Sequence, residues 1–206
     1  TWKNATGWVA AVITALAGDG LNVSIDTRNS AVMDAAIGAG AKIINDVTAL
    51  EGENSMKVAA ASGASVILMH MQGDPGTMQN DPKYTDAPQD VRSYLAGRIK
   101  ACEDAGISRQ RIAVDPGIGF GKTMTHNLEI LARMDTFHAL GCAVVLGASR
   151  KSFIGTLSGE SEAGRRAAGS VAAALAARNL GVQIFRVHDV YETHQALAVW
   201  DAVAGH

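Results

Sequence analysis

Six short apolar runs, separated by segments rich in alanine and leucine, constrain the fold of this chain more than any other feature of its sequence. They lie at residues 21–26, 42–47, 65–70, 111–115, 143–149 and 183–189. Apolar residues in a row are typical of strands in a parallel sheet that helices cover on both faces. The pattern therefore predicts one α/β domain built from repeated strand–helix units.

Each run ends in polar or ionisable side chains: Asp26, Asn45 with Asp46, His70, Asp115, Ser149 with Lys151 just beyond, and Arg186 with His188. In a (β/α)8 TIM barrel the carboxyl ends of all strands meet at one face, where the active site lies. We therefore expect these side chains to converge on one site of such a barrel. An open, doubly wound sheet of six strands is the alternative.

The number of units is too small for a whole barrel. A TIM barrel needs eight strands and typically ~250 residues, whereas this chain has 206 residues and six units. Residues 7–18, which precede the first strand, have the pattern of a helix. We expect a single domain over residues 1–206 that holds six of eight units and lacks the first two.

Composition excludes several classes of protein. A formal net charge of −2 gives no basic footprint for nucleic acid, and no apolar run is long enough for a membrane span. Cys102 and Cys142 have no metal-binding spacing, so we expect free thiols in a reducing, cytoplasmic compartment. The alanine-rich helix expected at residues 169–177 is a candidate for a subunit contact.

Residues 115–127, DPGIGFGKTMTHN, put a carboxylate and three glycines at a strand-to-helix junction. A P-loop needs glycine five residues before the Gly121-Lys122 pair, but Pro116 stands there. Gly117, Gly119 and Gly121 also lack the GxGxxG spacing of a dinucleotide site. A purely structural glycine turn and a binding site remain as the two interpretations of this segment.

Six motifs together resemble the dihydropteroate synthase family. They are NVSIDT (22–27), AKIINDV (41–47), VILMHMQGDPGTMQ (66–79), DPGIGFGKTMTHN (115–127), GASRKSFIG (147–155) and RVHDV (186–190). The resemblance implies a pterin-binding TIM barrel that joins 6-hydroxymethyl-7,8-dihydropterin pyrophosphate to p-aminobenzoate and releases pyrophosphate. It also implies Mg²⁺ bound with the pyrophosphate, a homodimer and a sulfonamide target.

Two motifs of that family, the NVTPDSFSDGG-like and GESTRPG-like loops of its first two units, do not occur in these 206 residues. Two alternatives therefore stay beside the synthase. One is a pterin-dependent methyltransferase barrel, which would not be expected to carry the SRK and RVHDV motifs. The other is a truncated, non-catalytic remnant that binds pterin.

The resemblance also implies roles for individual residues. Asp115 holds the amino-pyrimidinone edge of the pterin, Asp26 and Asn45 contact the rest of the ring, and Met71 and Phe120 form apolar walls. Ser149 and Lys151 border the aminobenzoate, next to Gly147. The catalytic residues are Lys151, near the pterin carbonyl, and Arg186 and His188, which hold the leaving group, with Arg186 also against the pterin face.

Elementary chemistry agrees with these roles. The carboxylate of Asp115 can accept two adjacent N–H groups in charge-assisted hydrogen bonds. Arg186 and His188 alternate on the last expected strand, so their side chains share a face, where a guanidinium and an imidazole can hold an anion. No residue of the chain is expected to bind a metal directly.

Overall fold

The computed structural model describes residues 2–73, 76–78 and 80–205, with side chains from Gly7 onward. Three residues of the 66–79 motif, Asp74, Pro75 and Gln79, lie outside the described residues. The chain divides into two compact units, Thr1–His70 with Tyr94–Val114 and Met71–Ser93 with Asp115–His206. Each unit is described by itself, and a single domain over residues 1–206 stays a prediction.

The first unit contains a parallel sheet whose strands alternate with helices. Its elements are α1 (Trp2–Gly18), β1 (Ser24–Asp26), α2 (Ser30–Gly38), β2 (Ile43–Asp46), α3 (Ser55–Ser62), β3 (Ser65–Met69), η1 (Arg109–Arg111) and β4 (Ile112–Asp115), together with most of α4 (Ala87–Asp104). Strands β1, β2 and β3 pair in parallel, with Ser24 opposite Ile43 and Ile44 opposite Val66. The strands follow chain order, whereas a doubly wound sheet would reverse it.

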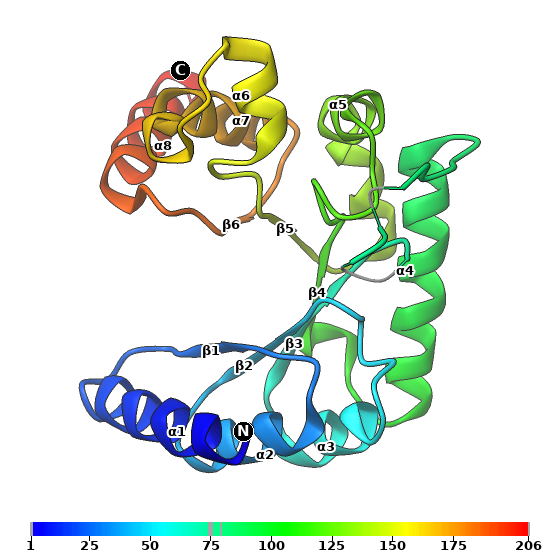
Figure 1. Ribbon diagram of the computed structural model, residues 1–206, viewed down its shortest axis with the longest axis vertical. Helices are drawn as coiled ribbons and strands as arrows, with labels where there is room; N and C mark the ends of the chain where they lie inside the picture. Colours follow the sequence, from blue (N-terminus) through cyan, green and yellow to red (C-terminus); the bar gives the residue numbers. More distant parts are fainter. Residues whose placement is uncertain (1, 74–75, 79, 206) are drawn as a thin grey trace. The chain divides into compact units, whose positions relative to one another are not determined.

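Helices α1, α2 and α3 lie side by side along β1, β2 and β3 (Figure 1). Ile13, Ala36 and Ala41 form a buried cluster on this side of the unit. Helix α2 begins where the Asn29 side chain accepts hydrogen bonds from the N–H groups of Ala31 and Val32 at 3.0 and 3.3 Å, which satisfies donors that the helix itself cannot pair. Capping therefore fixes where α2 begins, and the buried cluster packs beside it.

The second unit contains a shorter parallel pair of strands and several helices. Its elements are α5 (Met124–Ala132), η2 (Met134–Leu140), β5 (Ala143–Leu146), α6 (Ser152–Ser158), η3 (Ala163–Arg165), α7 (Ala167–Asn179), β6 (Ile184–Phe185) and α8 (Val190–Ala204). β5 and β6 pair with Val145 opposite Ile184. Helix α7 packs against α5, α6 and α8. Among the described residues, no helix is long and apolar enough to cross a membrane.

Strand boundaries differ from the sequence predictions most at β5 and β6. The runs at 143–149 and 183–189 were expected to be strands, but β5 ends at Leu146 and β6 contains only Ile184 and Phe185. The N–H of Arg186 still donates to the carbonyl oxygen of Leu146, at 2.9 Å. The N–H of His188 instead donates to a side chain, Ser149 Oγ, at 3.2 Å. The ladder ends here because the N–H of His188 bonds to a side chain and not to the neighbouring strand.

Candidate active site

Two of the predicted site residues, Asp26 and Asn45, meet at the carboxyl ends of β1 and β2 in the first unit. They stand opposite each other in the strand register, and Asn45 Nδ2 donates to Asp26 Oδ2 at 2.7 Å. Asn45 is 3% exposed. The neighbouring Asp46 is occupied by its own turn, because its carboxylate accepts the N–H and Oγ1–H of Thr48 at 2.8 and 2.7 Å.

Asp115 closes β4 and begins a loop in the second unit whose shape requires glycine. Its Oδ1 accepts the N–H of Gly117 at 2.8 Å, and its side chain is buried. Gly117, Gly119 and Gly121 have φ values of +70°, +82° and +58°, a region that glycine enters without steric cost. The alternating glycines are therefore a structural turn, and that turn also fixes the Asp115 carboxylate.

The Lys122 side chain lies inside this loop. It is 3% exposed, and its Nζ donates to the carbonyl oxygens of Gly117 and Phe120 at 2.9 and 3.0 Å. Burial lowers the pKa of Lys122 to about 7, since desolvation outweighs the attraction of Asp115, and the positive charge of Lys151 lowers it further. The loop is thus organised around an amine at its centre.

Asn127 holds the same loop from helix α5. Its Oδ1 accepts the N–H of Gly119 at 2.7 Å, and its Nδ2 donates to the Thr123 carbonyl oxygen at 2.8 Å. Thr123 caps α5 together with His126, each side chain accepting the other residue's backbone N–H. The carboxylate, the glycine turn and the start of α5 therefore form one hydrogen-bonded assembly.

A cavity of about 250 Å³ lies beside this loop and collects six of the ten predicted site residues. It is lined by Phe120, Gly147, Ser149, Lys151, Arg186, Val187 and His188. Asp115 is joined to this group by an ion pair with Arg186, at 3.6 Å between Oδ2 and Nη2. Met71, which follows β3 and is half-buried, is not among the residues that line the cavity.

Lys151 crosses from the loop after β5 to the glycine loop. Its Nζ donates to the carbonyl oxygen of Ile118 and lies 4.4 Å from the centre of the Phe120 ring. A cation over an aromatic face is attracted by the ring quadrupole. Burial lowers the pKa of Lys151 to about 8, with Asp115 acting to raise it and Arg186 to lower it.

Gly147 makes room for the Arg186 guanidinium. A Cβ atom at position 147 would lie 2.8 Å from Arg186 Nη2, so the guanidinium would have to shift from its place. The Arg186 side chain is 44% exposed, in contrast to its buried partner Asp115. The guanidinium therefore lies between the carboxylate and the open side of the cavity.

His188 and Ser149 face each other at the edge of the cavity. His188 Nδ1 lies 3.0 Å from Ser149 Oγ. The prediction that Arg186 and His188 both lie on the last strand is wrong, because β6 ends at Phe185. Both side chains nevertheless line the same cavity.

Comparisons with known proteins show which family the chain belongs to. Residues 2–188 match the family model described as pterin binding enzyme. Dihydropteroate synthase from Neisseria meningitidis serogroup C is 45% identical over 198 residues, which are 95% of this chain and 70% of that protein. The chain belongs to the dihydropteroate synthase family.

Solved structures of the family share the fold. Dihydropteroate synthase from Yersinia pestis, in a sulfonamide drug complex, has a TM-score of 0.92 and 39% identity over 96% of this chain and 72% of that chain. The enzyme from Xanthomonas albilineans, in complex with 7,8-dihydropteroate, has a TM-score of 0.90 and 41% identity over 96% of this chain and 74% of that chain. The chain is thus an α/β protein with six of the strand–helix units of a TIM barrel, and it belongs to a family of transferases.

Family membership leaves the methyltransferase alternative without support. Five residues of the SRK and RVHDV motifs that distinguish the synthase line one cavity in this chain: Ser149, Lys151, Arg186, Val187 and His188. Among the described residues, no three His, Cys, Asp or Glu side chains gather as a possible metal site.

Sequence analysis did not single out four residues that shape the site: Lys122, Asn127, Arg150 and Asp189. All four lie within the motifs that carry the family resemblance. Lys122 was considered only as part of a failed P-loop match, and Arg150 only as the middle residue of the SRK motif. Their burial and their hydrogen-bond partners depend on how the loops fold, and the pattern of residue types does not predict the fold of these loops.

Proposed function

We propose that this chain joins 6-hydroxymethyl-7,8-dihydropterin pyrophosphate to p-aminobenzoate, as the family does. The observation that carries the proposal is the cavity in which Lys151 and Arg186 lie beside the buried carboxylate of Asp115. The bond between the pterin methylene carbon and the pyrophosphate oxygen breaks, and its electron pair leaves with pyrophosphate. The arylamine lone pair forms the new C–N bond, and that nitrogen loses one proton.

Asp115 is the proposed anchor of the pterin. Asp115 is 1% exposed, its Oδ1 accepts the Gly117 N–H, and its Oδ2 pairs with Arg186 at 3.6 Å. Because each carboxylate oxygen can accept two hydrogen bonds, the group retains capacity for two adjacent N–H donors of the pterin edge. Phe120 and Met71 are the proposed apolar walls of the ring.

Asp26 and Asn45 are proposed to contact the remainder of the pterin ring, from their positions in the family motifs. Asn45 donates through Nδ2 to Asp26, which orients the amide and presents its oxygen as an acceptor. An amide can both donate and accept, as the mixed edge of a pterin requires.

Arg186, His188 and Lys151 are the proposed catalytic residues, which stabilise the leaving pyrophosphate. Negative charge grows on this group as the C–O bond breaks, and fixed cations in a partly buried cavity stabilise it. A neutral arylamine already has a lone pair, so the site needs no base to activate the nucleophile. Positioning and electrostatics then supply most of the catalysis.

Ser149 and Lys151, next to Gly147, are proposed to border the aminobenzoate. Ser149 Oγ is held in place by His188 Nδ1. A residue beside the proposed aminobenzoate position therefore contacts a residue beside the proposed pyrophosphate position. We also propose that Mg²⁺ enters with the pyrophosphate, where it would neutralise part of the charge on the leaving group.

Two substitutions test the binding roles. Asp115→Asn should weaken binding of 6-hydroxymethyl-7,8-dihydropterin by ~2–4 kcal/mol, because the pair with the pterin loses its charge in a dry site. Arg186→Ala should weaken the pterin pyrophosphate far more than the unphosphorylated pterin. Calorimetric titration of both pterins measures both effects. Unchanged affinity in Asp115→Asn would refute the anchor, and equal losses for both pterins in Arg186→Ala would place Arg186 at the ring only.

The reaction itself is tested by incubating the chain with pterin pyrophosphate and p-aminobenzoate and measuring 7,8-dihydropteroate and pyrophosphate together. Equal amounts of both products are expected. Hydrolysis of the pterin pyrophosphate without dihydropteroate would contradict the proposed condensation. Binding of pterin without any turnover would favour the non-catalytic remnant.

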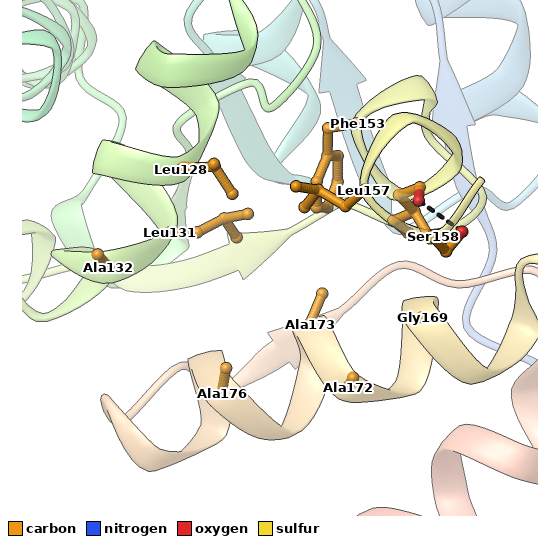
Figure 2. Close-up of a pocket in the computed structure, with 11 residues that line it drawn as sticks. Leu128, Leu131, Ala132, Phe153, Leu157, Ser158, Gly169, Ala172, Ala173 and Ala176 are labelled. Carbon is orange, nitrogen blue, oxygen red and sulfur yellow. Dashed lines mark hydrogen bonds between the residues drawn. The ribbon is translucent and has the colours of Figure 1, made fainter. Parts of the chain in front are cut away.

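The protein partner that we propose is a second copy of this chain. A cavity of about 470 Å³ in the second unit is lined by mostly apolar side chains of α5, α6 and α7 (Figure 2). At its rim Leu157 is 59% exposed and Leu128 is 38% exposed. An exposed apolar surface of this kind marks an interaction site, and the alanine-rich face of α7 lets a helix approach closely.

Ala173→Glu would place a charge in this apolar cavity and should shift the chain from dimer to monomer in sedimentation equilibrium. Asn179→Glu, which adds the same charge at the end of α7, should leave the mass unchanged. A monomer in the unmodified chain would contradict the proposal. A cytoplasmic location is also proposed, supported by the absence of a disulfide at Cys102 and Cys142 among the described residues.

A further inference from the structure

Arg150 has a backbone conformation that residues other than glycine rarely adopt. It lies between Ser149 and Lys151, and its φ is +59°, in the left-handed region. A non-glycine residue stays there only where surrounding groups over-determine its position, and such residues cluster at functional sites. The contacts of Arg150 therefore show what the loop after β5 is built to hold.

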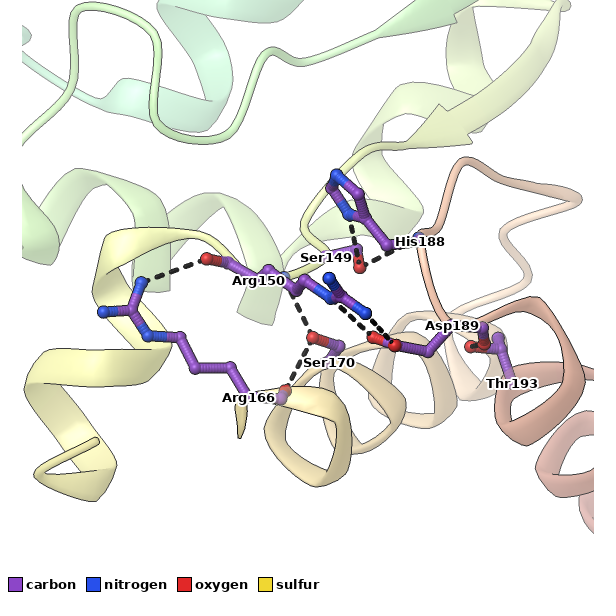
Figure 3. Close-up of polar contacts among 7 residues, drawn as sticks. All are labelled: Ser149, Arg150, Arg166, Ser170, His188, Asp189 and Thr193. Atoms are coloured by element: carbon purple, nitrogen blue, oxygen red, sulfur yellow. Dashed lines mark hydrogen bonds and ion pairs between the residues drawn. The ribbon is translucent and has the colours of Figure 1, made fainter. Parts of the chain in front are cut away.

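The backbone of Arg150 is tied to the start of α7 on both sides of the peptide. Its N–H donates to Ser170 Oγ at 2.9 Å, and its carbonyl oxygen accepts from Arg166 Nη1 at 3.0 Å (Figure 3). Ser170 Oγ in turn donates to the Arg166 carbonyl oxygen at 2.7 Å. These bonds satisfy both backbone groups of a residue in an unfavourable conformation.

The Arg150 side chain forms a two-point contact with Asp189, which directly follows His188. Nε donates to Asp189 Oδ2 at 3.1 Å, and Nη2 pairs with Oδ1. The Asp189 side chain is only 10% exposed. Asp189 is itself fixed at the start of α8, because its carbonyl oxygen accepts the N–H and Oγ1–H of Thr193 at 3.0 and 2.7 Å.

The ion pair thus joins the two segments that form opposite parts of the cavity. One segment presents Ser149 and Lys151, and the other presents Arg186 and His188. We propose that the Arg150–Asp189 pair is a positioning clamp that sets the spacing between these segments and so the fit of the leaving pyrophosphate. This inference rests on the proposed function, because it assigns the clamp to the same site.

A direct role of Arg150 in holding substrate fits the structure less well. Arg150 is not among the residues that line the cavity, and Asp189 neutralises its guanidinium in a bidentate pair. Arg150 and Asp189 are therefore positioning residues that act through their neighbours.

The chain offers a matched pair for comparison. Arg178 of α7 and Asp201 of α8 also form an Arg–Asp contact, at 2.7 Å between Nε and Oδ1. Their side chains are 37% and 49% exposed, and neither lines the cavity. Asp201→Asn therefore removes the same charge from the same kind of pair, away from the site.

The test uses Asp189→Asn, Arg150→Gly, their double variant and Asp201→Asn. Glycine at position 150 keeps access to the left-handed conformation, so this variant removes the clamp without straining the loop. Calorimetry measures affinity for the pterin pyrophosphate and for the unphosphorylated pterin, and thermal unfolding measures stability. Each single clamp variant should lose on the order of 10- to 100-fold affinity for the pterin pyrophosphate. The unphosphorylated pterin should bind nearly as before.

The double variant should bind the pterin pyrophosphate as tightly as the single variant with the lower affinity. Each single substitution already removes the one contact that the two residues share. Asp201→Asn should match the unmodified chain in both affinities. Arg150→Lys, which keeps a charge without the planar fork, should fall between the unmodified chain and Arg150→Gly.

Several outcomes would overturn the clamp. One is equal affinity for pterin pyrophosphate in Asp189→Asn and Asp201→Asn, and another is additive loss in the double variant. A fall in thermal stability without a selective loss for the pyrophosphate form would show a purely structural pair. Failure of the unmodified chain to bind either pterin would instead refute the proposed function, so the two failures are distinct.

Discussion

The loops after β4 and β5 both carry residues of the cavity, but different interactions hold them in shape. In the loop after β4, glycines occupy the left-handed positions and Lys122 donates to carbonyl oxygens on either side of the turn. In the loop after β5, the left-handed residue is Arg150, which is held by Asp189, 39 positions along the chain. The first loop is fixed mainly by its own sequence, and the second depends on a distant partner.

This difference predicts different consequences of substitution. A change in the glycine loop meets backbone that cannot move away, so it should cost stability. A change in the Arg150 loop releases a contact between two segments, so it should cost affinity for the charged substrate. Substitutions in each loop can break or sharpen this distinction.

Gly121→Ala should have the largest effect. A Cβ atom at position 121 would press on the backbone of Gln72, with its nitrogen 2.9 Å away, in addition to the strain of a φ of +58°. We expect unfolding free energy to fall by about 2–4 kcal/mol. Gly63→Ala is the control, since its φ is +71° with nothing within 4 Å, and it should cost only about 1–2 kcal/mol. Equal losses in urea unfolding would show that Gln72 yields and that the glycine loop is not rigid.

Lys122→Met should change how stability depends on pH. The pKa of Lys122 falls from its ordinary value of 10.5 to about 7 in the folded chain. Between these values the unfolded chain holds a proton that the folded chain has released, so the free energy of unfolding rises with pH. Below pH 7 both states are protonated and the cost of burying the charge is fully present.

Urea unfolding of both proteins at pH 7, 8 and 9 checks this prediction. The stability of the unmodified chain minus that of Lys122→Met should grow with pH by at most about 1.4 kcal/mol per unit. Other groups, such as Lys151, contribute to both proteins and largely cancel. If stability depends on pH in the same way in both proteins, Lys122 keeps its ordinary pKa and is less enclosed than the loop geometry indicates.

The two loops also show how far sequence can predict this site. Asp26, Asn45 and Asp115 were placed correctly at strand ends, because an apolar run followed by a polar residue is a local signal. The glycine positions were visible for the same reason. The left-handed conformation of Arg150 had no local signal, since it depends on Ser170, Arg166 and Asp189, which lie far along the chain.

Strand length was the weaker part of the fold prediction. An extended segment that pairs with a neighbouring strand and one that bonds to a side chain have the same residue types. Residues 186–189 were therefore expected to continue β6, whereas His188 bonds to Ser149 Oγ. The burial of Lys122 could not be predicted from the sequence either, because a lysine in a glycine-rich loop is usually solvated. Only the folded turn encloses this side chain.

Lys151 touches both loops, and its titration should have the smallest effect of the three. Its Nζ donates to the Ile118 carbonyl oxygen of the glycine loop, and its pKa is lowered by burial to about 8. As pH rises through this value the ammonium loses its charge, and the cavity loses one of the cations that face the leaving group. We expect kcat/KM for the pterin pyrophosphate to fall roughly tenfold between pH 7 and pH 9, because this parameter reports the pKa of the free enzyme.

Lys151→Arg should remove this alkaline fall, since a guanidinium stays charged there, whereas Lys122→Met should retain it. If the fall disappears in Lys122→Met and persists in Lys151→Arg, the titrating amine is the one inside the glycine loop, and that loop would depend on its charge state.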